Sequence, residues 1–397
     1  MSISNTYKST FIATAMTLAN LAFCSDLSEE KRISKLSIEN DLFTMDTSIY
    51  LQVRAEFGDL IFSEDQVVES SEIDLYFRRA TIGFYGRALV KNIRYGITLS
   101  GDETPQNKVT PSFSEEDGAT FNAYLEYAIY DDLSIRFGKG KLPYSRVYLV
   151  SSTRQLFSER PYYIFSWDDV LPRYAQTNLS LRGALSPWID YHVSIAKAWR
   201  NGDSLYEDDS RVVNSSPQFT GRLDWSPAGW KEKKQSDAHL GQGQHLTFGV
   251  YGVLQNEINY TETFSNRQSE KRFIYGADVS FHKQALSVQF EVNSWEVKST
   301  ILEDNRRTLG YVVQSGYYFS NSKLEPAIRY EKFDNDVDGT DSEVKKITLG
   351  LNKYYKKHNL KLMFNYEHTS FGRHVELLRP ENKLSSDAFR VTAQFIF

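Results

Sequence analysis

The last nine residues, 389–397, read FRVTAQFIF and decide the fold class. Their odd-numbered positions are apolar or small and include three aromatic residues, whereas the even-numbered positions are mostly polar. This alternation is the pattern of a β-strand with one apolar face. Such an edge would invite aggregation in a soluble protein, but a closed barrel in lipid removes the edge and places the apolar face against acyl chains. The stretch therefore predicts a strand of a transmembrane β-barrel.

Length and composition fit the same fold class. The chain has 397 residues with 25 Tyr, 25 Phe and 6 Trp, yet its mean hydropathy is −0.47. After the N-terminal region, no segment approaches the roughly 18 apolar residues of a membrane helix. Length alone would suggest two or three soluble domains, but a barrel of sixteen strands of roughly ten residues also needs about this many residues.

The alternating pattern recurs sixteen times along the chain, and this regular recurrence is stronger evidence than any single segment. The fold class is therefore predicted to be all-β, a 16-stranded antiparallel transmembrane barrel formed by residues 49–397. The strands are expected near 49–57, 73–85, 92–100, 121–130, 133–139, 176–185, 189–199, 218–226, 245–255, 272–282, 285–298, 307–319, 323–333, 344–354, 359–368 and 387–397.

The connections between these segments alternate in length. Most connections after even-numbered strands are short and most after odd-numbered strands are long, as periplasmic turns and extracellular loops would be. The connection 227–244 departs from this rule, so either the strand count is wrong there or that turn is expanded. The longest connection, 140–175, follows the fifth strand and holds three prolines and many aromatic residues. We expect an inward-folded third external loop that forms a constriction.

Residues 1–24 are expected to be a signal peptide. Lys8 is their only charged residue, and the stretch 11–23 is mostly apolar or small. Residues 22–24 resemble a small-x-small cleavage site, and a degenerate lipoprotein signal at Cys24 is the alternative. Cys24 is the only cysteine, so the mature barrel has no disulfide on either interpretation. Residues 25–48 would form a short periplasmic extension or partial plug, at best with a short amphipathic helix.

Three segments carry a family resemblance: FRRATIGFYGR (77–87), RFGKGKLPYSR (136–146) and LFSERP (156–161). In this order they resemble the phosphate-selective porin O and P family. The resemblance covers the first half of the barrel and implies a homotrimeric outer-membrane channel that favours anions, in some members phosphate or polyphosphate. The aromatic C-terminal strand is similar to the sorting signal of bacterial outer-membrane barrels. The expected location is the outer membrane of a Gram-negative bacterium, among its lipid and lipopolysaccharide.

The resemblance also implies which cations bind the permeating anion. In a narrow pore, Arg or Lys offsets the desolvation cost of an anion, and Arg donates to phosphate in a bidentate way. The matched segments carry this role over to Arg78, Arg79, Lys139, Lys141 and Arg160. Strand parity and the charges of the 140–175 connection add Arg54, Arg94, Arg136 and Arg146 as lumen or constriction candidates.

Acidic residues share the polar parity, so a lumen of mixed charge is expected. For any single strand arginine, the leading interpretation is a salt-bridged ladder that stiffens the barrel. The region of the third loop, 139–175, is more basic, with six cations against three carboxylates, and would favour anions if it folds inward. The other expected lumen residues are Arg182, Arg222, Arg329, Lys346, Lys361 and Arg390, with Glu56, Glu126, Asp224, Asp278, Glu291, Glu331 and Glu367.

The second strand changes its apolar parity at Arg78–Arg79. Ile73 and Leu75 are apolar on odd positions, whereas Ile82 and Phe84 are apolar on even positions. A β-bulge would produce this change. An outward arginine at mid-membrane costs about 2–4 kcal/mol, so at least one of the two is expected to point inward, with Arg79 the better candidate.

Other functions have weaker support in the sequence. The seven histidines are scattered without a spacing typical of zinc, so no metal site, cofactor or enzymatic activity is expected. Ser280 and His282 share a strand face, which leaves an outer-membrane hydrolase as a remote alternative. The net charge of −5 argues against nucleic acid as a partner.

Two further alternatives remain open. A general or sugar and organic-acid diffusion porin could use the aromatic residues of the 140–175 connection as a stacking slide, although packing of these rings against the wall is the favoured interpretation. An adhesive or structural barrel with a plugged lumen is the other alternative. Conductance separates these two, because only the porin conducts.

Overall fold

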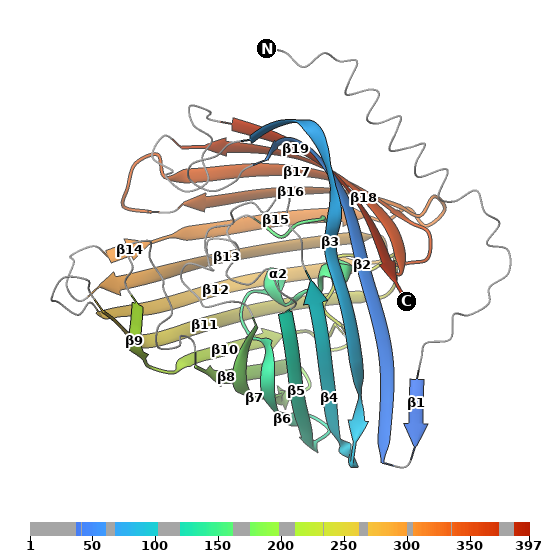
Figure 1. The fold of residues 1–397 in the computed structure, drawn as a ribbon, viewed down its shortest axis with the longest axis vertical. Helices are drawn as coiled ribbons and strands as arrows, with labels where there is room; N and C mark the ends of the chain where they lie inside the picture. The colour runs from blue at the N-terminus through green and yellow to red at the C-terminus, as the bar shows by residue number, and fades with distance from the viewer. Residues whose placement is uncertain are drawn as a thin grey trace.

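The computed structural model describes residues 37–40, 42–60, 68–101, 120–161, 175–197, 211–232, 234–261, 269–299, 305–334, 336–372 and 385–397. Most of these residues are in β-strands (Figure 1). Within them, no helix is long and apolar enough to cross a membrane. The strands are β1 (Ser37–Asn40), β2 (Phe43–Leu60), β3 (Val68–Ala88), β4 (Val90–Gly101), β5 (Thr120–Tyr130), β6 (Leu133–Lys141), β7 (Ala175–Ser186), β8 (Ile189–Ala196), β9 (Arg211–Ser215), β10 (Gln218–Trp225), β11 (Gln244–Thr261), β12 (Ser269–Lys283), β13 (Leu286–Ser299), β14 (Asn305–Arg307), β15 (Leu309–Tyr317), β16 (Leu324–Asp334), β17 (Glu343–Tyr354), β18 (Leu360–Phe371) and β19 (Ser385–Ile396).

The strands form one antiparallel sheet that closes on itself. The last strand, β19, pairs with β2, with Val391 opposite Ala55. β9 and β10 both lie along β11, β14 and β15 both lie along β13, and β1 forms only a hairpin with β2. The sheet is therefore a closed barrel with sixteen strand positions, and the predicted fold class and strand count are confirmed.

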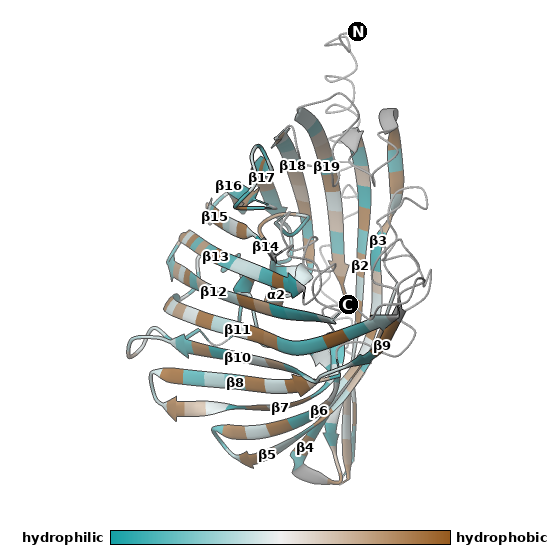
Figure 2. Cartoon of the chain, turned by 90° about the vertical axis from the view of Figure 1, so that its left-hand side faces the viewer, coloured by the Kyte–Doolittle hydropathy of each residue, from teal (hydrophilic) through white to brown (hydrophobic). Residues whose placement is uncertain are grey.

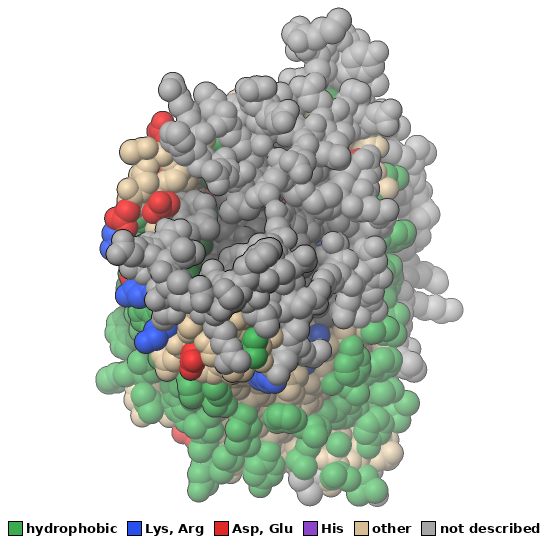
Figure 3. Space-filling model, turned by 60° about the vertical axis from the view of Figure 1, so that its left-hand side comes forward, with side chains coloured by type: hydrophobic (Ala, Val, Ile, Leu, Met, Phe, Trp, Pro, Cys, Tyr) green, Lys and Arg blue, Asp and Glu red, His purple; other side chains and the backbone are tan. Residues whose placement is uncertain are grey.

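The two faces of the barrel wall differ in polarity. Along β16 every second residue from Glu325 to Phe333 is buried, while outward residues such as Ile328 are exposed. Figure 2 shows this alternation as bands of hydropathy along the strands. Figure 3 shows hydrophobic side chains covering much of the wall with few charged groups among them. This outer surface is suited to lipid, whereas the inner face holds the charged groups.

The first barrel strand begins earlier than predicted. β2 starts at Phe43 instead of near residue 49, and it pairs with β1 on one side and with the far end of β3 on the other. The described residues of 37–48 are thus part of the sheet, not a separate extension or a helix. Long β3 explains the difference, because Phe43 lies opposite Ala88 and the backbone of this stretch is hydrogen-bonded there. The predicted signal peptide, 1–24, lies outside the described residues.

One connection at the short-turn end of the barrel is expanded. The β17–β18 turn lies at the end that holds Phe397, since Ile396 donates a hydrogen bond to the carbonyl of Asn359. The β10–β11 connection, residues 226–243, lies at this same end. β10 and β11 pair in unbroken register, with Trp225 opposite Phe248. The strand count is therefore right, and the turn is expanded; we call residues 226–243 the long turn.

A charge introduced on the outer face tests the assignment of that face to lipid. Leu349 is exposed on the outer face midway along β17, whereas Leu309 is exposed at the first residue of β15. Arg at mid-membrane costs about 2–4 kcal/mol and Arg near the interface costs about 0–1 kcal/mol. We expect Leu349→Arg to lower the free energy of unfolding by the larger amount and the control Leu309→Arg by the smaller. Reversible denaturant unfolding in lipid vesicles measures both, and equal losses would contradict the assignment.

Candidate functional site: the charged interior of the barrel

The predicted β-bulge occurs at the arginine pair. Arg79 lies opposite Gln52 and Phe77 lies opposite Val53, so Arg78 is the extra residue on β3. The bulge lets two successive arginines be buried, with Arg78 9% and Arg79 8% exposed. Arg79 Nη1 donates to Gln52 Oε1 at 3.1 Å. Both arginines therefore lie on the inner side of the wall, whereas the sequence required only one of them to point inward and favoured Arg79.

Glu159 is the carboxylate that the inner arginines share. Arg78 Nε donates to Glu159 Oε1 at 2.9 Å, and Arg54 Nη1 donates to the same oxygen. Arg54 Nη2 also donates to the carbonyl of Ser158 at 2.9 Å, and its Nη1 lies 3.2 Å from Glu56 Oε1. The connection after β6 is thus tied to β2 and β3 by buried, charge-assisted hydrogen bonds.

The protonation of Glu159 follows from these neighbours. Burial alone would raise its pKa, but the guanidinium groups of Arg54, Arg78 and Arg79 hold the pKa well below its usual range. Glu159 is therefore ionised at neutral pH. Its negative charge stabilises the cluster above the usual carboxylate pKa, and this contribution is lost only as the pH falls through the lowered value.

The segment 142–161 is held against strands on the far side of the barrel. Its backbone bonds to four inner side chains in sequence order. Lys361 Nζ donates to the carbonyl of Gln155 at 3.1 Å, and Asn352 Nδ2 donates to the carbonyl of Leu156 at 2.8 Å. Arg329 Nη1 donates to the backbone carbonyl of Glu159 at 2.9 Å. The backbone N–H of Ser158 donates to Asn365 Oδ1 at 2.9 Å. The segment follows β6, and its contacts reach β16, β17 and β18, which lie across the barrel from β6 in the strand order. The segment therefore crosses the interior of the barrel.

Apolar packing reinforces these polar contacts. Leu156 and Phe157 are at most 1% exposed and pack with Ala327 and Tyr354 of the wall. Tyr148 lies within the short helix α2 (Arg146–Leu149), and Tyr144 lies two residues before it. The two rings are stacked with their centroids 4.6 Å apart, and each residue is 3% exposed. Because these two rings are buried in the core, they pack the segment and do not form a sugar slide. Tyr162, Tyr163 and Trp167 lie outside the described residues.

Lys141 and Arg160 add positive charge next to the arginine pair. Lys141 Nζ contacts the carbonyls of Tyr148, Leu149 and Val150 at 2.8–3.3 Å, and Arg160 Nη2 donates to the Val150 carbonyl at 2.9 Å. The charges of Arg160 and Arg79 both act on Lys141. We call Arg54, Arg78, Arg79, Lys141 and Arg160 the basic group; Glu159 is the carboxylate bound within it.

Gly138 helps to bring Lys141 to the inner side. Arg136 and Lys141 have opposite parity on β6, yet both contact inner groups. Gly138 lies between them with φ 141°, a conformation that side-chain-bearing residues rarely adopt. A Cβ there would lie 2.2 Å from the carbonyl oxygen of Ala123. The glycine of the quoted Gly-x-Lys segment thus has a backbone role.

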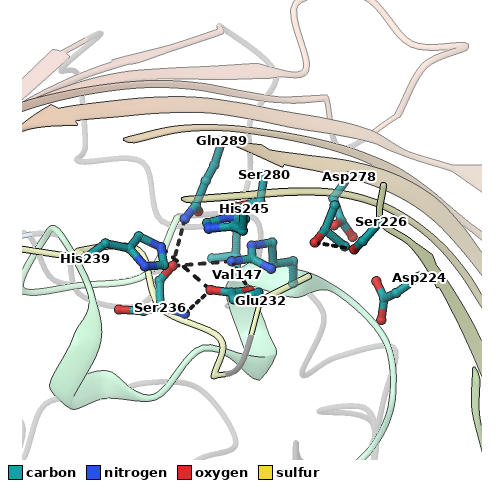
Figure 4. A network of polar contacts seen from close by, with 12 residues as sticks. Val147, Asp224, Ser226, Glu232, Ser236, His239, His245, Asp278, Ser280 and Gln289 are labelled. Carbon is teal, nitrogen blue, oxygen red and sulfur yellow. Dashed lines mark hydrogen bonds and ion pairs between the residues drawn. The ribbon is translucent and has the colours of Figure 1, made fainter. Parts of the chain in front are cut away.

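Arg146, a predicted constriction cation, is neutralised by the long turn. Its Nη2 lies 2.8 Å from Glu232 Oε2 and donates to the Ser236 carbonyl at 3.3 Å. Asp237 N and Ala238 N both donate to the Arg154 carbonyl. Figure 4 shows Glu232 and Ser236 in this network beside Val147 of α2. The long turn therefore folds inward and meets the segment 142–161, and Arg146 does not belong to the basic group.

The remaining predicted cations lie elsewhere on the wall. Glu126 on β5 binds Arg136 at 2.6 Å and Arg182 at 2.5 Å, with Arg94 at 3.7 Å. The side chain of Lys139, opposite Thr177 on β7, has no ion pair or hydrogen bond with a described residue. Arg94 and Arg136 are thus held in a separate cluster around one carboxylate.

Several inner charges form the ladder that strand parity predicted. Arg222 contacts Asp224 at 2.6 Å and Asp278 at 2.7 Å. Arg390 binds Glu56 at 2.5 Å and also Glu367, which Lys346 contacts at 2.7 Å. For these residues the structural interpretation is confirmed, because each cation is matched by buried carboxylates that offset its desolvation.

Sequence reasoning missed two features of the interior. In the sequence analysis Glu159 was counted only as one of three acids in the 140–175 connection, although it binds two of the predicted arginines. The long turn was flagged as an anomaly of length, but its contacts with the interior were not foreseen. Its buried residues Ser236, Asp237 and Ala238 carry no hydrophobic signal that would have placed them inside.

The fold and the charged interior define an outer-membrane porin. Solved structures of similar fold include an anion-selective porin from Comamonas acidovorans (TM-score 0.59, 10% identity, 89% of this chain and all of that one). The outer-membrane channel DcaP of Acinetobacter baumannii is also similar (TM-score 0.58, 11% identity, 90% of this chain and 99% of that one). These likenesses concern the fold.

The sequence comparison is more specific. Residues 48–397 match the family described as Phosphate-selective porin O and P, and the chain belongs to this family. An uncharacterised protein of Aquifex aeolicus (strain VF5) is 30% identical over 366 residues, which cover 85% of this chain and 84% of that protein. The proteins in this family and of this fold are channels, and the predicted resemblance is confirmed.

Removing the charge of Glu159 tests how the segment 142–161 is held. Glu159→Gln leaves the buried Arg54 and Arg78 without their shared carboxylate, and breaking a buried pair costs about 3–5 kcal/mol. We expect the segment to open more often and trypsin to cleave faster after Arg154 or Arg160. The control Glu126→Gln disrupts a three-arginine cluster on β4–β7, and no ion pair or hydrogen bond of this cluster involves the described residues of the segment. Equal cleavage in both variants and the parent would refute this role.

Proposed function

We propose that this porin lets small anions diffuse passively across the outer membrane of a Gram-negative bacterium, with phosphate or polyphosphate the favoured solute. The basic group is the observation that carries the proposal. Arg54, Arg78 and Arg79 lie around Glu159 in the interior, and Lys141 and Arg160 lie next to Arg79. The next carboxylate, Glu56, is shared between Arg54 and Arg390.

The chemistry of the basic group suits an anion. A cation excess in a confined, partly dehydrated space offsets the loss of an anion's hydration and repels cations. Arginine matches phosphate oxygens with two parallel donors, and lysine adds a compact charge. The carbonyl contacts of Lys141 and Arg160 add no net negative charge, and the carboxylates that the structure shows in contact with the basic group are Glu159 and Glu56.

Other parts of the wall limit the selectivity. The Arg222 and Arg390 ladders balance charge locally and add little net positive charge to the wall, whereas Glu126 is contacted by three arginines and leaves a second local excess of cations. Selectivity would then come from two regions, the basic group and the cluster around Glu126, and be modest. The family description and the anion-selective Comamonas porin support the anion preference without establishing it for this chain.

The proposal also covers the contacts of the outer wall and the oligomeric state. The apolar outer wall would contact membrane lipid and lipopolysaccharide. A homotrimer is proposed because a trimer form is known for Vibrio cholerae OmpT, which has a similar fold (TM-score 0.54, 10% identity, 90% of this chain and all of that one). The second candidate function is a general diffusion porin, favoured by the locally neutral ladders.

Conductance in planar bilayers tests the proposal. Under a KCl gradient the parent protein should show an anion-selective reversal potential, and added phosphate should block chloride current. Arg79→Glu and Lys141→Glu should each lower the anion-to-cation permeability ratio by about fivefold or more, the factor that corresponds to roughly 1 kcal/mol. Lys298→Glu is the control, because Lys298 is exposed near the end of β13.

The outcomes separate the candidate functions. Weakly selective current without phosphate block would leave a general porin. Unchanged reversal potentials in both charge reversals would mean that the basic group does not line the path of the ions. Absence of current from a folded barrel would favour an adhesive or structural role.

A further inference from the structure

Three histidines that are far apart in the sequence meet at the long turn. His239 belongs to the long turn, His245 lies near the start of β11, and His282 lies near the end of β12. His245 and His282 are directly opposite in the β11–β12 register, so their side chains share a face. The potential ligand atoms of the three residues all lie within 4.8 Å of one another. The spacing of the three histidines in the sequence does not predict this cluster.

The three rings are packed together and shielded from water. The ring centroids of His239 and His282 are 4.1 Å apart, and those of His239 and His245 are 4.6 Å apart. His245 is 2% exposed and His282 is 1% exposed. Figure 4 shows His239 and His245 in one network with Glu232, Ser236 and Ser280. The cluster is therefore buried in the interior and does not lie on the surface.

Two ring nitrogens of the cluster are buried without a hydrogen-bond partner among the described residues, His239 Nε2 and His282 Nδ1. The Nε2 atom of His282 lies 2.7 Å from the Gln284 carbonyl, which can only accept, so this nitrogen carries the proton. The lone pair of His282 is therefore on Nδ1. A ring held through one nitrogen by a backbone carbonyl, with the other nitrogen open, is the usual arrangement of a metal-binding histidine.

We propose that His239, His245 and His282 bind a divalent transition-metal ion of the Zn²⁺ class. Imidazole nitrogen is a preferred ligand of such ions, and three histidines with one further position make a common tetrahedral set. Glu232, whose Oε1 atom is 3.6 Å from His239 Nε2, or a water molecule would complete the set. Zn–N distances of about 2.0–2.1 Å require the rings to draw closer together. His239 can move most easily because it lies in a turn.

The ion would fasten the long turn to the barrel wall. His239 is in the turn, whereas the other two ligands are in adjacent strands of the wall. The same turn contacts the segment 142–161 through Glu232 and Arg146 and through Asp237, Ala238 and Arg154. None of the three ligands belongs to the basic group, and the role of the ion is to hold the long turn against the wall where the turn contacts the segment 142–161.

Metal titration of the purified, chelator-treated full chain in detergent tests this inference. Competition with a chromogenic chelator should show one saturable Zn²⁺ site per chain, and Co²⁺ should give the visible absorption of a tetrahedral site. His239→Gln should weaken binding at least about 100-fold, the upper limit for loss of an outer partner alone. His358→Gln is the matched control, because His358 Nε2 contacts the Ala238 carbonyl of the same turn without joining the cluster.

Two controls make the result decisive. Heat-modifiable migration on gels and circular dichroism show that each variant is a folded barrel, and His282→Gln provides a second ligand variant if His239→Gln does not fold. Loss of binding in the ligand variants with retention in His358→Gln supports the site. No saturable binding by the parent, or equal binding by His239→Gln and the parent, overturns it. Neither result depends on whether the barrel conducts anions.

Discussion

The backbone hydrogen bonds between β19 and β2 close the barrel, and the other features of the structure depend on this closure. In lipid no water is available for unpaired backbone groups, so an open sheet edge would cost several kcal/mol for each unsatisfied group. Closure removes both edges at once. It also fixes which face of each strand is inside, because the side chains alternate and the register cannot shift by one residue without exposing charge to lipid.

Closure creates an enclosed space, and the chain fills it from both ends. The segment 142–161 enters from the end with long connections, and the long turn enters from the end that holds Phe397. They meet where Arg146 binds Glu232 and where the Arg154 carbonyl accepts two backbone hydrogen bonds. Each segment brings carboxylates that match wall cations. Buried charges are tolerated here because nearly every one has an opposite charge or a set of carbonyls within reach.

The interior is therefore divided into regions with different charge. Around Arg222 and Arg390, acids and bases balance, and these clusters stiffen the wall, whereas Glu126 holds three arginines with one carboxylate. At the basic group, Arg54 and Arg78 share Glu159, and Arg79, Lys141 and Arg160 lie close by, because the bulge at Arg78 turns two successive arginines inward and Gly138 lets Lys141 follow. Local backbone irregularities thus concentrate positive charge in one place. A regular barrel with the same residues would spread it along the wall.

The sequence by itself determined the barrel, its sixteen strands, the apolar outward face of most strands, and the bulge on β3. These follow from the period of two of a strand, which is a local property and recurs in every segment. The tertiary structure alone decided which charges neutralise one another and which residues meet in the interior. Glu159 reaches Arg54 across 105 positions of sequence, and His239 reaches His282 only because the long turn folds inward. Such pairings depend on the three-dimensional course of connections, for which the alternation of polar and apolar residues carries no information.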